Sequence, residues 1–249
     1  MYDLQKYLPG CLLATVALFG GAYPAFAADA PSLGTASSFV VLSATPGVGG
    51  EVTCTDSAIT GDIGSSGAQS AVVQTRCTIP GAIIAPVSAQ VLTDVNSAFD
   101  ALAAVSCDQT LTGTLGGVAL APGVYCFEAA AVLTGTLTLA GPSNGVWIFK
   151  TGTAKTGVVG SGALTGTSFS VVMAGGAQPC NVFWTTTPTE AATMTDSDFK
   201  GTILSGAAIT STRGTFVGRA LAKAAVTFTG VAATGCYAGN ANQAAFPFR

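Results

Sequence analysis

The acidic and basic residues near the end of the sequence are the first candidates for chemistry. Asp196 and Asp198 are the only close pair of carboxylates, and a glycosidase needs two carboxylates on opposite sides of a cleft. Residues at positions i and i+2 of a strand lie on the same side, so this pair is better suited to binding water at a corner. Arg219 and Lys223 with Asp196 form the candidate set for a polysaccharide lyase, which is the enzymatic alternative.

Histidine is absent from the 249 residues. Its absence removes the commonest general base, the usual partner of a Ser or Cys nucleophile and the commonest metal ligand. The seven cysteines contain no Cys-x-x-Cys pair, so a zinc site made of thiolates is also disfavoured. We therefore expect no catalytic residues, no metal and no cofactor.

Charge is scarce along the whole chain. Lys, Arg, Asp and Glu make up 8% of the residues, the formal net charge is −3 and the sequence pI is about 4.7. Such a chain lacks the basic field that holds nucleic acids or anionic membranes. Because 49% of the residues are hydrophobic, the chain can still bury a large core.

The amino terminus is typical of an export signal. Lys6 is its only cation, an apolar run covers residues 11–19, and Ala25-Phe26-Ala27 matches a cleavage site. The apolar run is shorter than the about 20 residues that a transmembrane helix needs. We expect residues 1–27 to be removed, and residues 28–249 to form a single secreted domain without membrane association.

Six cysteines remain after this cleavage, an even number in a chain bound for an oxidising compartment. The connectivity of six cysteines is not fixed by sequence alone. Pairing between neighbours along the chain favours three disulfides, which are Cys54–Cys77, Cys107–Cys126 and Cys180–Cys236.

From Leu33 onward the chain consists of short apolar and Thr-rich runs separated by Gly, which predict strands. The clearest runs are Ser38–Leu42, Val118–Leu120, Val132–Leu139, Val146–Phe149, Phe169–Met173 and Val182–Thr186. Residues 86–104 differ, because apolar residues recur there at helical spacing and Pro86 stands at the first turn. This pattern predicts one helix that packs along the body of the domain.

An internal repeat near the end of the chain is the most informative feature. The segment from Thr193 to Leu204 aligns without gaps with the segment from Thr210 to Leu221. A third copy begins at Thr227, after the same interval again. A short repeat with strand-like content and Gly corners predicts a β-solenoid.

The repeat also predicts which side chains face outward. Alternation along a strand places Thr193 and Thr195 on one side and Ala192 and Met194 on the other. The same alternation turns Thr210, Thr212, Thr227 and Thr229 outward over the inward residues Ile209, Ser211, Val226 and Phe228. Neighbouring coils lie about 4.8 Å apart, and alternate residues of one strand about 6.7 Å apart. The threonines should therefore form a flat grid of hydroxyl and methyl groups.

Specific motifs occur in a fixed order along most of the predicted mature chain. They are Leu33–Leu42, Ile59–Gly64, Leu120–Tyr125, Leu133–Leu139, Val146–Phe149, Gly176–Trp184, Phe199–Leu204 and Gly218–Ala222. In order and spacing these motifs resemble the ice-binding proteins of the "domain of unknown function 3494" family. The resemblance covers about residues 33–229.

The resemblance implies a mostly β fold, namely a discontinuous right-handed parallel β-solenoid of triangular section with one long α-helix packed alongside. It also implies a secreted antifreeze protein that adsorbs to an ice crystal surface through a flat Thr-rich face, without cofactor or catalysis. We expect the protein to be a monomer. Mapped onto this chain, the ice-binding residues are Thr193, Thr195, Thr210, Thr212, Thr227 and Thr229, with Thr165 and Thr167 as further members.

Two observations keep an alternative open. Asp196 and Arg213 lie beside the predicted columns, and charged groups hold hydration shells that would disturb an ordered water layer. Thr also suits exposed strand positions whatever a protein does. The main alternative is therefore a non-catalytic adhesin or structural scaffold that uses the same solenoid.

Overall fold

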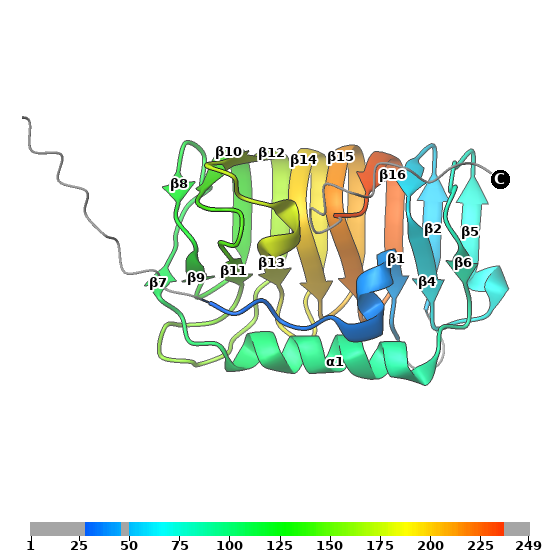
Figure 1. Cartoon of the computed structure of the whole chain (residues 1–249), viewed down its shortest axis with the longest axis horizontal. Coiled ribbons are helices and arrows are strands. Elements are labelled where there is room, and N and C mark those ends of the chain that lie inside the picture. The colour runs from blue at the N-terminus through cyan, green and yellow to red at the C-terminus, as the bar shows by residue number, and fades with distance from the viewer. Residues whose placement is uncertain (1–27, 46–49, 237–249) are drawn as a thin grey trace, which may run out of the picture.

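The computed structural model describes residues 28–45 and 50–236, so the predicted signal peptide at residues 1–27 lies outside the described residues. The chain forms a stack of strands with a helix along its side (Figure 1). Every pairing between named strands is parallel. The predicted mostly β, parallel solenoid with an α-helix alongside is confirmed.

Within the described residues, sixteen strands build the stack. They are β1 (Phe39–Ser43), β2 (Val52–Thr55), β3 (Ala58–Thr60), β4 (Asp62–Ser65), β5 (Val72–Thr75), β6 (Ile83–Ile84), β7 (Gln109–Thr110), β8 (Ala119–Leu120), β9 (Gly123–Cys126), β10 (Ala131–Ala140), β11 (Trp147–Lys150), β12 (Leu164–Ala174), β13 (Val182–Thr185), β14 (Ala192–Ser205), β15 (Ile209–Ala222) and β16 (Val226–Thr234). The helical segments are the α-helix α1 (Ala89–Ala104) and the 3-10 turns η1 (Gly34–Ser38), η2 (Gln69–Ala71) and η3 (Pro179–Asn181). All six strand segments predicted from the sequence are present, and the segment predicted at Phe169–Met173 extends further, through the whole of β12.

Each long strand turns corners and so covers more than one face of the solenoid. In β14 and β15 the first corner falls at Asp196 (φ 51°) and Arg213 (φ 58°), which adopt the left-handed conformation. The second corner falls at Gly201 and Gly218, where a Cβ atom on Gly218 would lie 1.8 Å from the carbonyl oxygen of Gly201. This corner requires glycine because the backbones of adjacent coils approach so closely.

The solenoid is discontinuous along the chain, as predicted. The last strand, β16, pairs on one side with its sequence neighbour β15 and on the other side with β2 and β3 from the amino-terminal part. Similarly, β1 pairs with β15. The first coils of the sequence therefore stack against the last ones, and segments from opposite ends of the described chain become neighbours.

The interior contains a stack of aromatic rings that runs from coil to coil. Its members, in contact order, are Tyr125, Phe149, Trp184, Phe199, Phe216 and Phe228. Neighbouring ring centroids lie between 3.8 and 5.5 Å apart. Such rings bury large apolar areas, and they hold the coils at a fixed spacing from within.

One side of the solenoid, here called the helix face, is covered by α1 (Figure 1). The helix buries the predicted stripe of Val91, Val95, Ala98, Phe99 and Leu102. These residues pack on apolar side chains of the strands beneath, among them Leu42, Val124, Ile148, Phe183, Leu204 and Leu221.

The start of the helix differs from the prediction, which placed it at Pro86. The helix begins at Ala89. The reason is that the N–H of Val87 still donates to the carbonyl oxygen of Ser65 at 2.8 Å, so the chain follows the sheet up to that point.

Candidate functional site

Two columns of threonine run across the coils on the face that precedes the first corner. The first column contains Thr165, Thr193, Thr210 and Thr227, and the second contains Thr167, Thr195, Thr212 and Thr229, each in register with its neighbour on the next coil. The structure therefore brings all eight predicted residues together on one face.

The alternation predicted for these strands is also present. The residues that flank the threonines are buried in the core, and they are Ala192, Met194, Ile209, Val226 and Phe228. Ser211, the polar member of the inward set, is buried as well. The threonines are half-buried or exposed, because each packs against its neighbours in the column and leaves its outer side in solvent.

The columns continue beyond the predicted residues into the amino-terminal coils. Thr227 pairs with Thr53, Thr229 with Thr55, and Thr55 in turn with Thr75. Sequence analysis missed these three residues, because they lie far from the repeat along the chain. A local signal was available, since Val52-Thr53-Cys54-Thr55 has the same alternation as Val226-Thr227-Phe228-Thr229. We call the residues of both columns, with Thr53, Thr55 and Thr75 included, the Thr face.

The first column ends in valine on both sides. Val132 pairs with Thr165, and Val73 pairs with Thr53. Both valines are exposed, by 57% and 47% of their surface, although valine is usually buried. Valine has the branched shape of threonine, so the surface keeps its contour. From Val132 to Val73 this column contains no charged residue.

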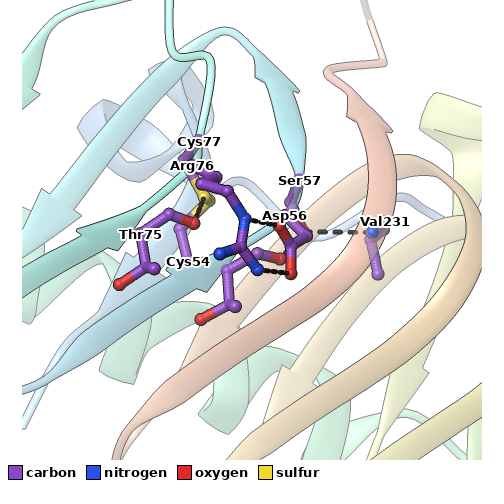
Figure 2. Close-up of a disulfide and its surroundings, with 8 residues drawn as sticks. Cys54, Asp56, Ser57, Thr75, Arg76, Cys77 and Val231 are labelled. Carbon is purple, nitrogen blue, oxygen red and sulfur yellow. Dashed lines mark hydrogen bonds and ion pairs between the residues drawn. A yellow bond between two sulfur atoms is a disulfide. The ribbon is translucent and has the colours of Figure 1, made fainter.

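Four charged residues border the Thr face at the first corner, and they form two ion pairs. Arg213 donates from Nε to Oδ1 of Asp196 at 2.6 Å and from a terminal nitrogen to Oδ2 at 2.8 Å. Arg76 holds Asp56 in the same two-bond manner at the ends of β5 and β2, which lie beyond β16. Figure 2 shows this second pair beside the disulfide of Cys54 and Cys77. Each fork joins two adjacent coils.

These forks alter the electrostatics of the corner. Hydrogen bonds from Arg213 hold the pKa of Asp196 below its usual value, and Arg76 does the same for the pKa of Asp56. The carboxylates therefore stay ionised and matched by a guanidinium. The hydration shells expected to disturb the Thr columns belong to neutral pairs at a corner, outside the flat part of the face.

A serine that follows each of these aspartates fixes the corner from inside. Ser197 Oγ donates to the carbonyl oxygen of Thr195 and accepts the N–H of Phe169 on the preceding coil. Ser57 Oγ likewise donates to the carbonyl oxygen of Thr55 and accepts the N–H of Val231 (Figure 2). The repeated sequence Thr-Asp-Ser thus makes the same rigid corner twice.

Two of the three predicted disulfides are present, namely Cys54–Cys77 and Cys107–Cys126. The third is not, because Cys180 and Cys236 are free thiols. The prediction of a Cys180–Cys236 bridge is therefore wrong for this structure. The sulfur of Cys236 instead accepts a hydrogen bond from Arg219.

The candidate catalytic residues do not converge. Asp196 is held by Arg213, and Asp198 accepts a hydrogen bond from the hydroxyl of Thr215 at 2.8 Å. Arg219 lies beside Cys236, and the Lys223 ammonium sits 4.2 Å from the centre of the Phe99 ring.

A hollow of about 170 Å³ lies between α1 and the coils, and it is lined by Lys150 and Lys223 but not by either aspartate of the acidic pair. Lys150 has a structural role there, because its Nζ donates to the carbonyl oxygens of Ala103 and Val105 at the end of α1. Burial lowers the pKa of Lys150.

Within residues 28–45 and 50–236, no group of three or more Cys, Asp or Glu side chains is arranged to hold a metal ion. In the same part of the chain, no helix is both long and apolar enough to cross a membrane.

Comparison with known proteins gives a consistent result. Residues 44–234 match the family described as ice-binding-like. Over 214 residues the chain is 37% identical to an ice-binding protein of Nostoc sp. (strain HG1), a match that covers 84% of this chain and 74% of the relative.

Two solved structures are similar as well. An ice-binding protein from the Antarctic ascomycete Antarctomyces psychrotrophicus is 31% identical with a TM-score of 0.68, over 83% of this chain and 98% of that one. An ice-binding protein from an Antarctic biological consortium is 29% identical with a TM-score of 0.70, over 83% of this chain and 92% of that one. The chain described here belongs to the ice-binding-like family.

Proposed function

We propose that this protein adsorbs to ice through the Thr face, without catalysis. The observation that carries the proposal is the register, which aligns threonines of consecutive coils in two uncharged columns. Membership of the ice-binding-like family and the ice-binding proteins among its relatives support the same function.

The physical basis is the regular spacing of the hydroxyl and methyl groups. Along a column the groups repeat about every 4.8 Å, and the two columns are about 6.7 Å apart. Such a grid orders water over a flat area. The methyl groups exclude water while the hydroxyls bond to it, so the ordered layer can merge with a growing crystal.

Rigidity strengthens this effect. The aromatic stack fixes the coils from inside, and the serine and Asp–Arg contacts fix the corner beside the columns. A surface that is already ordered loses little conformational entropy on binding. Binding energy is therefore available for adsorption to the crystal.

The remaining features fit a non-catalytic role. The carboxylates of Asp196 and Asp198 are engaged by Arg213 and Thr215 on the outside of the solenoid. We further propose that the protein acts as a secreted monomer, which agrees with the export signal expected at residues 1–27 and with disulfides such as Cys107–Cys126.

Partition of the protein between growing ice and liquid tests the proposal. At micromolar concentration, we expect the folded protein to enter the ice, whereas an unrelated β-rich protein of similar size stays in the liquid. A folded protein that remains in the liquid would contradict ice binding. It would favour the adhesin, which should bind its target above the freezing point.

A further inference from the structure

Three of the four lysines in the described part of the chain line two adjoining hollows at the carboxyl end of α1. The first is the hollow of about 170 Å³ described above, which is lined by Lys150 and Lys223. The second has a volume of about 140 Å³ and is lined by Lys150 and Lys155. Because charged residues make up only 8% of the sequence and its net charge is −3, this concentration of positive charge sets the region apart from the rest of the molecule.

The second hollow, here called the polar hollow, lies between the end of α1 and a turn that follows β11. It is lined by residues 103–107, Lys150, Thr153 and residues 155–157. The turn is closed by a hydrogen bond of 2.8 Å from the N–H of Ala154 to the carbonyl oxygen of Val158. On the other side, the disulfide between Cys107 and Cys126 ties the segment after the helix to β9. Both walls of the polar hollow are therefore fixed.

Main-chain carbonyl oxygens hold both ammonium groups of the polar hollow. Lys150 Nζ donates to the carbonyl oxygens of Ala103 at 3.0 Å and Val105 at 2.7 Å. Lys155 Nζ donates to the carbonyl oxygen of Asp108 at 2.9 Å. Since an ammonium group has three N–H donors, Lys150 keeps one donor for a further partner and Lys155 keeps two. Lys150 is only 4% exposed, and a buried donor without a partner costs free energy.

The positive charge of the polar hollow is not matched by carboxylates. Neither Lys150 nor Lys155 forms an ion pair with another described residue, and no carboxylate from the described ranges lines this hollow. Burial lowers the pKa of Lys150, as expected for a cation without a carboxylate beside it. The end of a helix contributes about half a negative charge, which is less than the charge of two ammonium groups.

We propose that the polar hollow binds a small oxyanion, that is, a phosphate, a sulfate or a carboxylate group, between Nζ of Lys150 and Nζ of Lys155. Lysine binds such groups as a point charge. The hydroxyls of Ser106 and Thr156 line the same hollow and can donate further hydrogen bonds. The hollow is smaller than the about 300–1,000 Å³ of pockets for drug-sized ligands, so its size suits a small ion.

A bound oxyanion would connect the turn after β11 to the end of α1. Because the ion would bind the folded state, it should stabilise that state in proportion to its concentration and affinity. None of the residues that line the polar hollow belongs to the Thr face, so the inference does not rest on the proposed function.

Calorimetric titration of the folded protein at pH 7 tests the proposal. Sodium phosphate, sodium sulfate and sodium acetate are titrated separately, and sodium chloride keeps the ionic strength constant because salt screens exposed charges. We expect at least one of the three anions to bind saturably, one per chain, with a Kd of about 1 mM or lower. The same anion should raise the melting temperature. The anions that bind identify the chemical group, and the absence of saturable binding by all three would overturn the proposal.

Charge-removing variants test the position of the site. Lys155→Gln should weaken binding about five- to tenfold, because it removes two free donors and one charge. Lys155 is the better test residue, since Lys150 also holds the end of the helix. Lys223→Gln, which alters only the first hollow, should change the Kd by about twofold at most. Lys200→Gln should match the parent, because Lys200 Nζ donates to the carbonyl oxygen of Val171 on β12.

Circular dichroism should show these variants folded. Equal affinities of folded Lys155→Gln and the parent would contradict the assignment to the polar hollow. A larger loss of affinity in Lys223→Gln than in Lys155→Gln would also contradict it, because the anion would then lie in the first hollow.

Discussion

The solenoid presents two exposed faces that are built by the same strands but differ in composition. The Thr face precedes the first corner. The face beyond that corner is here called the mixed face, and it carries two outward columns. The first column consists of Thr136, Ser170, Asp198, Thr215, Ala232 and Ala58. The second column consists of Thr138, Val172, Lys200, Val217, Thr234 and Thr60. Both faces have the same strand spacing, since β14 and β15 run through both.

The difference between the faces shows what the fold alone does not provide. On the mixed face the charged side chains of Asp198 and Lys200 interrupt the columns. Each of these side chains organises water in a different way, so regular spacing does not yield a regular hydration layer. On the Thr face the same spacing carries threonine, with exposed valines only at the two ends of the first column. We infer that ice binding depends on the uniform composition of the Thr face, and that the solenoid sets the spacing of its side chains.

The largest expected effect on stability comes from the frame that both faces share. Replacing the Cys107–Cys126 bridge by two serines should lower the free energy of unfolding by about 2–5 kcal/mol, as measured by denaturant titration. Ice adsorption at temperatures near 0 °C should persist in the fraction that stays folded, because the bridge is not part of the Thr face. Loss of adsorption from a fully folded variant would show that the bridge contributes to ice binding and not only to the stability of the solenoid.

A partial loss of activity is expected at the end of the Thr face that sequence analysis missed. Thr53→Tyr places a bulky ring on the amino-terminal coil, next to Thr227. Thermal hysteresis should fall about two- to fivefold, while unfolding changes by only about 0.5 kcal/mol because the position faces solvent. Thr60→Tyr on the mixed face of the same coils is the matched control. If Thr53→Tyr keeps full activity, the working surface stops at β16.

A smaller effect is expected from the charges at the corner. Asn tolerates the left-handed conformation of these positions, so Arg213→Asn leaves Asp196 as an unpaired charge beside Thr195 and Thr212. Its hysteresis should fall by about half. The double variant Asp196→Asn with Arg213→Asn should recover most of the parent's activity, because the charge is gone. Equal activities of the single and the double variant would show that neutral pairing is irrelevant to the face.

The smallest effect concerns pH, which should change the stability of the solenoid and leave ice binding by the Thr face unchanged. Hydrogen bonds from the side chain and the N–H of Thr35 hold the pKa of Asp94 below its ordinary value of 3.8 and tie η1 to α1. The ionised carboxylate therefore stabilises the fold above that value, and this contribution is lost as the pH falls through the lower folded pKa. The melting temperature should drop between pH 5 and pH 2, and less so in Asp94→Asn. Adsorption by the folded protein should be constant between pH 5 and 9.

The sequence alone was sufficient to predict the strand register where neighbouring coils follow one another directly along the chain. The constant interval of the repeat predicted the register of β14, β15 and β16, because each of these coils follows the previous one directly. The same interval relates Asp196 to Arg213, so their pairing was within reach of the same analysis.

Where coils meet across the break in the solenoid, sequence spacing was uninformative. Nothing local relates Thr227 to Thr53, and the pairing of β16 with β2 becomes evident only in three dimensions. The bridge between Cys180 and Cys236 was predicted wrongly from their order along the chain, which carries no information on the Arg219 side chain that donates to the sulfur of Cys236 in the fold.

Two substitutions in one strand test the central account most directly. Thr212 and Thr215 lie on either side of the corner at Arg213 in β15, and both face solvent. In ice-affinity partition, Thr212→Tyr should stay largely in the liquid, whereas Thr215→Tyr and the helix control Asn96→Tyr should enter the ice like the parent. Circular dichroism should show all three variants folded. Equal uptake of folded Thr212→Tyr and the parent would contradict the account and place the ice-binding surface elsewhere.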